Sequence, residues 1–208
     1  MKFLVMPGDG IGPEIVPVAV AALEALDKKL GLNITLEEVP IGFASLETGG
    51  NTFPDEALAK AEESDGVIMG PTDTLAYPSL AEGGRGPSAF MRTGLDLYAN
   101  IRPAKTRPGV PSAVDSMDLV FARENTEGFY ADRSMHLGNG EMMVTEDVAI
   151  AVRKITREAS RKIAEAAFKL ALQRRKKVTI VTKRNVLKMT DGLFHDTVRE
   201  VGKNYPDV

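Results

Sequence analysis

The chain contains no cysteine, which excludes disulfides, thiolate metal sites and cysteine nucleophiles and fits a reducing compartment. It also lacks any stretch near the roughly 18 consecutive apolar residues that a membrane-spanning helix requires. The apolar run at the start, within Lys2–Met6, is far too short for a secretory signal. We therefore expect a cytoplasmic protein with no membrane partner.

A strong excess of charge is absent as well. The 208 residues carry 26 Lys and Arg against 29 Asp and Glu, a net charge of −3. A nucleic-acid-binding face is expected to be a lysine-rich stripe, so we expect no nucleic-acid partner. His136 and His195 are the only histidines and lack metal-ligand spacing. His195, next to Phe194, favours a structural interpretation.

Alternating strand and helix patterns dominate the first hundred residues. Lys2–Met6, Asn33–Val39 and Gly66–Gly70 are expected strands, and helices are expected after Pro13 and from about Thr52 to Ser64. This order indicates an α/β fold with a parallel sheet. The first helix carries apolar residues at helical spacing: Ile15, Val18, Ala22, Leu26 and Leu30.

The rest of the chain is predicted in the same way. Residues 71–94, rich in Gly, Pro, Ser and Thr, are expected to form a long functional loop. Thr156 should cap a helix that buries Ala159, Ile163, Ala166, Ala167 and Leu170. The remaining expected elements are extended segments at Leu95–Lys105, Asp118–Arg123 and Lys176–Val181, a hairpin arm over Phe129–Val144 centred on Gly138-Asn139-Gly140, and a helix over Asp191–Gly202.

Three arginines and a tyrosine stand among apolar or β-prone residues, where solvated charge is not expected. They are Arg92, Arg102, Arg123 and Tyr130. A guanidinium is a fixed fork of donors that binds a carboxylate at two points, so converging arginines would bind a small acid with several carboxylates. The alternative is that each arginine forms an ordinary surface or interface ion pair.

Two further motifs permit more than one interpretation. Gly8-Asp9-Gly10-Ile11-Gly12-Pro13 loosely resembles a dinucleotide fingerprint, but Pro13 occupies the sixth position, and a tight strand-to-helix turn explains the glycines equally well. Lys183 directly follows an expected strand, where α/β sheets bind ligands. It is either a general base whose basicity is lowered by neighbouring cations or a solvated lysine.

Taken together, four segments resemble the β-decarboxylating dehydrogenases, the family of isocitrate, isopropylmalate, homoisocitrate and tartrate/D-malate dehydrogenases. The segments are GDGIGPE (Gly8–Glu14), DLYANIRPAK (Asp96–Lys105), RENTEGFY (Arg123–Tyr130) and the turn Lys183–Leu187. The resemblance covers the whole chain and implies the N-terminal portion of an isopropylmalate-dehydrogenase-like two-domain α/β fold, with parallel and mixed sheets flanked by helices. It implies a cofactor-side domain over residues 1–98 and a substrate and dimerisation domain over 99–208, with the C-terminal part missing.

The resemblance also implies roles for individual residues. Arg92, Arg102 and Arg123 would clamp the carboxylates of the malate core, with Ser88 near the variable substituent. Tyr130 would protonate the enol left when CO2 departs, and Lys183 would help remove the hydroxyl proton. Thr72 and Asn185 would lie near the nicotinamide of NAD or NADP.

A homodimer with shared active sites is implied too, because Tyr130 and Lys183 would come from different subunits. The arm from about Arg133 to Asp147 would clasp the partner, and the helix after it would join the dimer bundle. Mg2+ or Mn2+ would act as Lewis acid, but its aspartate ligands and the adenosine loop are expected beyond Val208, so no metal ligand is assigned within the chain.

The substrate is expected to be a small hydroxy acid set by the loop before Arg92. Ser88 and Ala89 stand where isopropylmalate enzymes place leucines, which favours isocitrate or homoisocitrate, with 3-isopropylmalate and tartrate or D-malate as alternatives. Arg85 would either meet a third carboxylate or point to solvent. The competing hypothesis for function is a non-catalytic truncated relative that binds carboxylates or dimerises.

Overall fold

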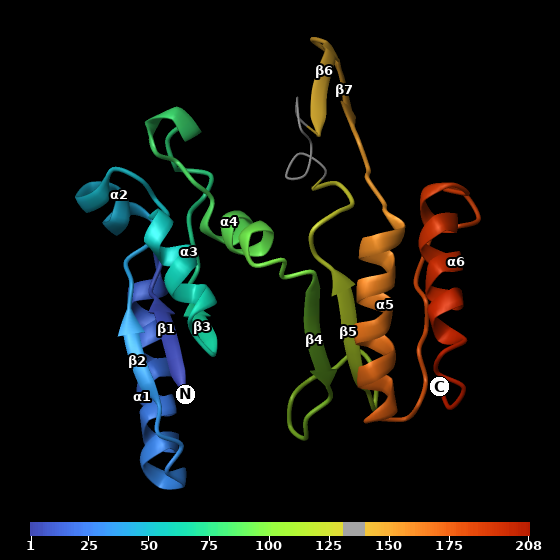
Figure 1. Ribbon diagram of the computed structural model, residues 1–208, viewed down its shortest axis with the longest axis horizontal. Helices are drawn as coiled ribbons and strands as arrows, with labels where there is room; N and C mark the ends of the chain where they lie inside the picture. The colour runs from blue at the N-terminus through green and yellow to red at the C-terminus, as the bar shows by residue number, and fades with distance from the viewer. Residues whose placement is uncertain (131–139) are drawn as a thin grey trace. The chain divides into compact units, whose positions relative to one another are not determined.

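The computed structural model describes residues 1–130 and 140–208. They divide into two compact units, Met1–Leu95 and Asp96–Val208, and each unit has a hydrophobic cluster of its own. The α/β class expected from the sequence is confirmed, with a parallel sheet in the first unit and antiparallel pairs in the second (Figure 1). Among the described residues, no helix is long and apolar enough to cross a membrane.

The first unit is built on three parallel strands, all of which the sequence predicted. Strand β1 (Lys2–Met6) lies in the centre, with β2 (Thr35–Glu38) and β3 (Gly66–Met69) on either side. Phe3 pairs with Leu36 on one side and with Gly66 on the other. The helices of this unit are α1 (Gly12–Leu30), α2 (Phe43–Gly49), α3 (Asp55–Glu62) and α4 (Pro87–Gly94), with a 3-10 turn at Leu80–Glu82.

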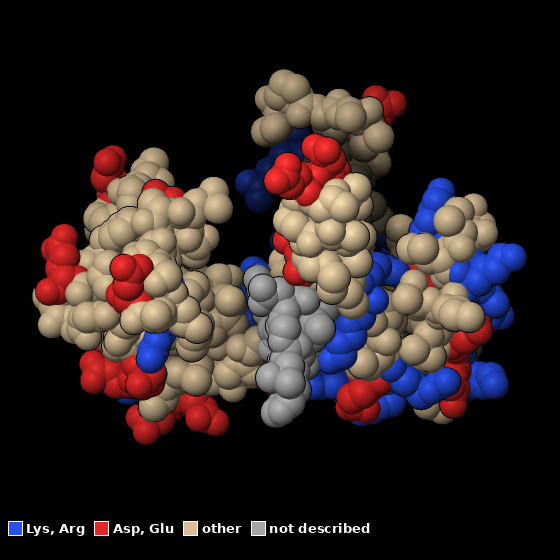
Figure 2. Space-filling view, turned by 90° about the horizontal axis from the view of Figure 1, so that it is seen from above, with Lys and Arg blue, Asp and Glu red and all other residues tan. Residues whose placement is uncertain are grey.

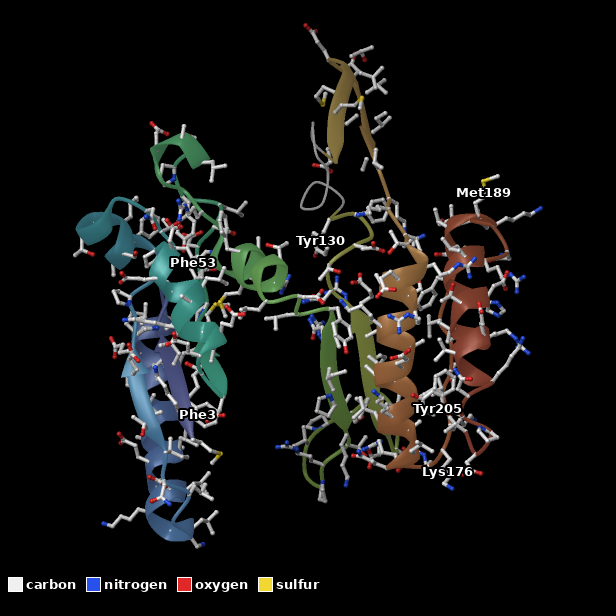
Figure 3. The ribbon with its side chains drawn as sticks, viewed as in Figure 1. Phe3, Phe53, Tyr130, Lys176, Met189 and Tyr205 are labelled. Carbon is white, nitrogen blue, oxygen red and sulfur yellow. The ribbon has the colours of Figure 1, made fainter. Side chains whose placement is uncertain are left out.

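The core of the first unit lies on one face of this sheet. Leu4 and Met6 alternate to the same face of β1 and are completely buried. They pack with Phe53, with Ala57 of α3 and with Met91 of α4. Phe53 is labelled in Figure 3. This core therefore holds α3 and α4 against the sheet.

Helix α1 covers the sheet with a different face from the one expected. Val16 is its buried apolar residue, and Val20 and Leu23 follow it at helical spacing and are half-buried. The apolar stripe that predicted the helix stays exposed within the described chain; its large members are Ile15, Val18, Leu26 and Leu30.

Two helices of the first unit were not expected. Helix α2 was not predicted, and the long loop predicted for residues 71–94 contains the 3-10 turn and helix α4. Pro87 stands in the first turn of α4, where its missing N–H costs no helical hydrogen bond. The loop prediction was therefore wrong for the segment that carries Ser88 and Arg92.

The second unit is layered. Strands β4 (Ala99–Lys105) and β5 (Asp118–Glu124) form an antiparallel ribbon, α5 (Arg157–Leu172) packs on the ribbon, and α6 (Thr190–Gly202) packs on α5. A separate hairpin of β6 (Glu141–Thr145) and β7 (Val148–Ala151) projects beyond the start of α5 (Figure 1). Helix α5 thus lies between the ribbon and α6.

Helix α5 begins as the sequence predicts, with the Thr156 side chain accepting a hydrogen bond from the Ala159 N–H. Its buried face differs in part from the expected one: Ala159 and Ile163 are buried as predicted, whereas Ala166, Ala167 and Leu170 are only half-buried. Ser160, Ala164, Phe168 and Ala171 complete the buried set. The Phe168 ring stacks on Tyr205, with ring centroids 5.0 Å apart, in the layer between α5 and the end of α6 (Figure 3).

Two predictions in this unit need correction. Residues 177–182 are extended but join no sheet of the described chain; Val178 and Ile180 pack against the α5–α6 cluster instead. The hairpin turns at Glu146–Asp147, later than predicted. Gly138 and Asn139, the expected centre of the arm, and His136 lie outside the described residues.

Candidate functional site

Arg102 and Arg123 lie on the same exposed face of the β4–β5 ribbon. Arg102 pairs in register with Phe121, and Arg123 pairs with Asn100. Side chains directly opposite each other in an antiparallel pair share a face, so the two arginines are diagonal neighbours. Along β5 the exposed residues of this face alternate with Val120 and Ala122, whose side chains point to the other face and are half-buried. Two of the three predicted arginines are thus brought together.

A chain of amide hydrogen bonds holds Arg102 in place. Its Nε donates to Asn100 Oδ1 at 3.0 Å, and Asn100 Nδ2 donates to Asn125 Oδ1 at 3.4 Å. Asn125 is buried, and its own Nδ2 donates to the Leu97 carbonyl at 3.3 Å. Arg102 is thus oriented by its Nε, and its side chain is exposed.

Tyr130 lies beside Arg123. The guanidinium carbon of Arg123 is 5.9 Å from the centroid of the Tyr130 ring, within cation–π range. Figure 3 shows Tyr130 just past the end of β5 that carries Arg123. A phenol close to a cation is suited to proton donation toward a bound anion.

The loop between β5 and Tyr130 is fixed by two carboxylates. Glu124 accepts hydrogen bonds from the backbone N–H groups of Thr126 and Glu127, at 2.8 and 2.9 Å. The nearly buried Glu127 accepts from the Thr156 N–H at 2.8 Å and from the Thr156 hydroxyl at 2.6 Å, which ties the loop to the start of α5.

Lys183 and Asn185 lie on an exposed turn between the extended segment and α6. The Lys183 carbonyl accepts from the N–H groups of Val186 and Leu187, both at 2.9 Å. Arg184, Asn185 and Lys188 line a shallow hollow beside this turn. Because residues 177–182 join no sheet, the predicted place of Lys183 at the end of a parallel strand was wrong for the described chain.

His195 has ionic partners, consistent with its structural interpretation. Its Nδ1 lies 2.8 Å from Arg184 and 2.9 Å from the Asp196 carboxylate. The hydrogen bond from His195, followed by the charge of Arg184, lowers the pKa of the Asp196 carboxyl.

Arg92 and Ser88 both lie on α4 of the first unit and are half-buried. Arg85 has partners within the first unit. Its guanidinium forms an ion pair with Asp55, donates to the Phe53 carbonyl at 3.1 Å and lies over the Phe90 ring. Arg85 is therefore engaged within the first unit, with its side chain half-buried.

Thr72 lies on a loop that is organised by a buried carboxylate. Asp9 accepts from the N–H groups of Phe43 and Asp73, at 2.8 and 3.1 Å, and from the Tyr77 hydroxyl. Burial and then the hydrogen bond to Asp9 raise the pKa of Tyr77, while a hydrogen bond with the Thr72 side chain acts in the opposite direction. The roles of Asp9 and Tyr77 were not predicted from the sequence, although an acid between two glycines after a buried strand is an unusual signal.

The glycine turn is explained by close packing. A Cβ on Gly8 would lie 2.2 Å from the Pro71 carbonyl oxygen, and one on Gly12 would lie 2.1 Å from that of Pro7. Gly8 also has a φ of +77°, a conformation that other residues rarely adopt. The tight-turn interpretation therefore accounts for these glycines without a bound pyrophosphate.

The described residues do not by themselves form a binding site for a divalent metal. Across residues 1–130 and 140–208 there is no group of three or more His, Cys, Asp or Glu side chains able to hold an ion. Of the residues predicted to lie near a nicotinamide, Asn185 offers an exposed amide beside the hollow, and Thr72 offers a hydroxyl on its loop of the first unit.

Together these features define an α/β protein whose second unit presents paired arginines and a tyrosine of the anion-binding type. The sequence profile described as isocitrate/isopropylmalate dehydrogenase matches residues 2–208. The 3-isopropylmalate dehydrogenase of Archaeoglobus fulgidus is 39% identical over 208 residues, which is 100% of this chain and 58% of the relative. The isocitrate/homoisocitrate dehydrogenase of Thermus thermophilus is also 39% identical, over 99% of this chain and 57% of the relative.

The fold agrees with these relatives. The crystal structure of isocitrate dehydrogenase from Methylococcus capsulatus matches with a TM-score of 0.81 and 36% identity, covering 100% of this chain and 58% of that one. The chain belongs to the isocitrate/isopropylmalate dehydrogenase family, as its motifs indicated. It spans somewhat more than half the length of the relatives it matches.

Proposed function

We propose that this chain supplies the substrate-binding and acid–base residues of a cytoplasmic, NAD(P)- and divalent-metal-dependent dehydrogenase that oxidises and decarboxylates a malate-type 2-hydroxy acid. The observation that carries the proposal is the shared face of Arg102 and Arg123, with Tyr130 against Arg123. Two guanidinium forks on one face match the two carboxylates of a malate core.

The charge of the chain supports an anionic substrate on the second unit. Residues 96–208 hold 20 Lys and Arg against 15 Asp and Glu, a net +5, whereas residues 1–95 hold 6 against 14, a net −8. On the face drawn in Figure 2, Lys and Arg gather over the second unit, at the right. A positive field raises the local concentration of a carboxylate substrate.

Each residue has a defined part in this proposal. Arg102 and Arg123 orient the acid, with Arg92 and Ser88 contributed by the first unit. Lys183 takes up the hydroxyl proton as the carbon loses hydride, and Tyr130 returns a proton to the enol carbon after CO2 leaves. Thr72 and Asn185 would lie near NAD or NADP, which would supply the hydride acceptor. Mg2+ or Mn2+ would supply Lewis-acid chemistry, but the described residues offer no site for it.

A homodimer with shared sites is part of the proposal. Helix α5 packs both on the ribbon that carries Arg123 and on α6, the helix that follows Lys183, so Tyr130 and Lys183 follow elements in different layers of one chain. The β6–β7 hairpin exposes a row of apolar side chains, and an isolated two-stranded hairpin is marginal in water. A second copy of this chain would cover the hairpin.

The favoured substrate is isocitrate or homoisocitrate, because Ser88 leaves a polar group where an isopropyl pocket needs leucines. 3-Isopropylmalate and tartrate or D-malate are the alternatives. Arg85 pairs with Asp55, so the preference is not argued from a third carboxylate at Arg85. The two relatives at 39% identity bear the names of different substrates, so the preference depends on Ser88.

The test is the binding of these acids, measured by isothermal titration calorimetry. The sample is the full protein purified from its own organism, which is called the native protein below. Arg123→Met should weaken binding of the preferred acid at least about a hundredfold, because a desolvated guanidinium–carboxylate contact is lost. Arg157→Met is the matched control, since Arg157 pairs with Glu200 away from the ribbon. Equal affinity in wild type and Arg123→Met would contradict the proposal.

The second candidate is a non-catalytic relative that binds carboxylates or dimerises. This candidate also uses the face that carries Arg102 and Arg123 to bind carboxylates. It differs from the first in predicting no metal-dependent reduction of NAD or NADP. If Lys183→Ala and Tyr130→Phe each lower turnover at least about a hundredfold, the enzyme is supported. Acid binding with no turnover in the native protein would favour the second candidate.

A further inference from the structure

Asp191 is a buried carboxylate that neither the substrate nor the cofactor proposal uses. It lies in the first turn of α6, and its side chain is 5% exposed. Arg153 donates to its Oδ1 at 2.7 Å, and the backbone N–H of Lys183 donates to its Oδ2 at 2.7 Å. Both oxygens are therefore occupied, one by a cation and one by the turn that carries Lys183.

Backbone hydrogen bonds within the turn also connect Lys183 to the start of α6. The Lys183 carbonyl accepts from the N–H groups of Val186 and Leu187, and the Leu187 carbonyl accepts from the Asp191 N–H at 3.1 Å. The turn has exposed side chains and joins no sheet of the described chain, so the hydrogen bond from the Lys183 N–H to Asp191 is its tie to a buried group. Loss of that tie would let the Lys183 backbone move.

Arg153 belongs to a segment that also holds the Tyr130 loop. We call residues 153–156, between β7 and α5, the anchor segment. Gly128 and Lys154 exchange backbone hydrogen bonds at 2.8 and 2.9 Å, and Thr156 binds Glu127 twice. The anchor segment thus contacts the Tyr130 loop at Lys154 and Thr156, and the Lys183 turn through Arg153 and Asp191.

We infer that Asp191 is a positioning residue, which with Arg153 fixes the Lys183–Asn185 turn to the anchor segment that also holds the Tyr130 loop. The consequence for catalysis rests on the proposed function, because it requires Lys183 to be the base. In a dimer with shared sites, Tyr130 and Lys183 of one chain serve different sites. The anchor segment then connects the two sites, and it starts directly after the hairpin expected to contact the partner.

The first test is hydrogen exchange at single amides in the native protein. Asp191→Ala should speed exchange of the Lys183 amide at least about tenfold, because a buried charged acceptor is removed. Asp191→Asn, which keeps an acceptor and loses the ion pair, should show a smaller increase and serves if the alanine variant does not fold. Glu200→Ala, another ion-paired carboxylate on α6, should leave the Lys183 amide unchanged.

Exchange of the Gly128 amide should stay unchanged in all three variants, since its acceptor is the Lys154 carbonyl. An unchanged Lys183 amide in both Asp191 variants would overturn the inference, whatever the protein catalyses.

The second test separates positioning from a merely structural role. Asp191→Ala should lower kcat at least about tenfold while KM for the hydroxy acid changes less than about twofold, since the arginines are untouched. Arg153→Lys keeps the charge and should retain most of the turnover. A raised KM with unchanged kcat would overturn the inference. If instead Lys183→Ala left turnover intact, the proposed function would fail, and the exchange experiment would still decide whether Asp191 holds the turn.

Discussion

At the scale of single residues, Asp9 shows how one buried carboxylate organises several loops. It sits between Gly8 and Gly10 at the end of β1 and binds the start of α2, the backbone at Asp73 and the hydroxyl of Tyr77. The Tyr77 ring also packs edge-on against Phe43, with centroids 5.2 Å apart. The loop that carries Thr72 is therefore tied to the central strand of the sheet.

Asp9→Asn should lower the pKa of Tyr77 toward its ordinary value of about 10. In the wild type, burial and the hydrogen bond to Asp9 raise that pKa; the amide variant removes the negative charge but not the burial. Ultraviolet titration of the phenolate, with Tyr77→Phe subtracted to remove the other tyrosines, measures the change. An identical Tyr77 titration in wild type and Asp9→Asn would show that the carboxylate does not control this hydroxyl.

The same shift predicts how stability depends on pH. The folded state keeps the Tyr77 proton to a higher pH than the unfolded chain does, so the free energy of unfolding should fall as pH rises above about 10. Below that pH both states are protonated and the contribution is constant. Urea unfolding should show a shallower decline in Tyr77→Phe than in wild type, and parallel declines would contradict the assignment.

At the scale of elements, the start of α5 is held by several hydrogen bonds of one residue, Thr156. Thr156 accepts from the Ala159 N–H at 3.2 Å and donates to Glu127 at 2.6 Å. It caps the helix and fixes the Tyr130 loop with the same hydroxyl.

Thr156→Ala should lower the free energy of unfolding by about 1–2 kcal/mol for the lost cap, and by more where Glu127 loses its donor. Thr156→Ser retains the hydroxyl and should cost less than about 1 kcal/mol. Urea denaturation of the native protein measures both. Equal losses in the two variants would mean that the methyl group, and not the hydroxyl, matters at this position.

Helices and strands were predicted well where residues close together in the sequence determine them. The strands of the first unit and the Thr156 cap follow from short apolar runs and a hydroxyl at a helix start. Residues 176–181 were predicted as a strand on the same grounds, but a strand needs a partner, and the described chain pairs none with them. Helix α4 was missed because glycine and proline around it suggested a loop, although Pro87 fits a first helical turn.

The candidate site was predictable in its residue types but not in its arrangement. Arginines among β-prone residues indicated anion binding, and the register of β4 with β5 then placed Arg102 and Arg123 on one face. The roles of Asp9 and Asp191 could not be read from the sequence. Each depends on partners brought together by folding, such as Tyr77 for Asp9, 68 residues away, and Arg153 for Asp191, 38 residues away.

At the scale of the whole molecule, the exposed hairpin implies a partner. Met142, Met143, Val144, Val148 and Ile150 are each between 46% and 65% exposed on β6 and β7. Exposed apolar side chains concentrated on one projecting element are typical of an interface. In the proposed dimer they are covered by the second copy.

Met143→Asp should therefore weaken the dimer at least about tenfold, because it places an unpaired charge in an apolar interface. Val110→Asp is the matched control, since Val110 is 59% exposed in the turn between β4 and β5. Sedimentation velocity over a range of concentrations measures both. A dimer equally stable in wild type and Met143→Asp would place the subunit contact elsewhere.

The central claim is that each active site takes Tyr130 from one chain and Lys183 from the other, and mixed dimers test it most directly. Tyr130→Phe and Lys183→Ala native proteins, each inactive alone, are unfolded together, refolded and assayed for metal-dependent NAD(P) reduction. Half of the dimers should then be mixed, each with one intact site, so activity should recover to about a quarter of the wild-type value. No recovery from properly refolded mixed dimers would show that one chain supplies both residues and would contradict the account.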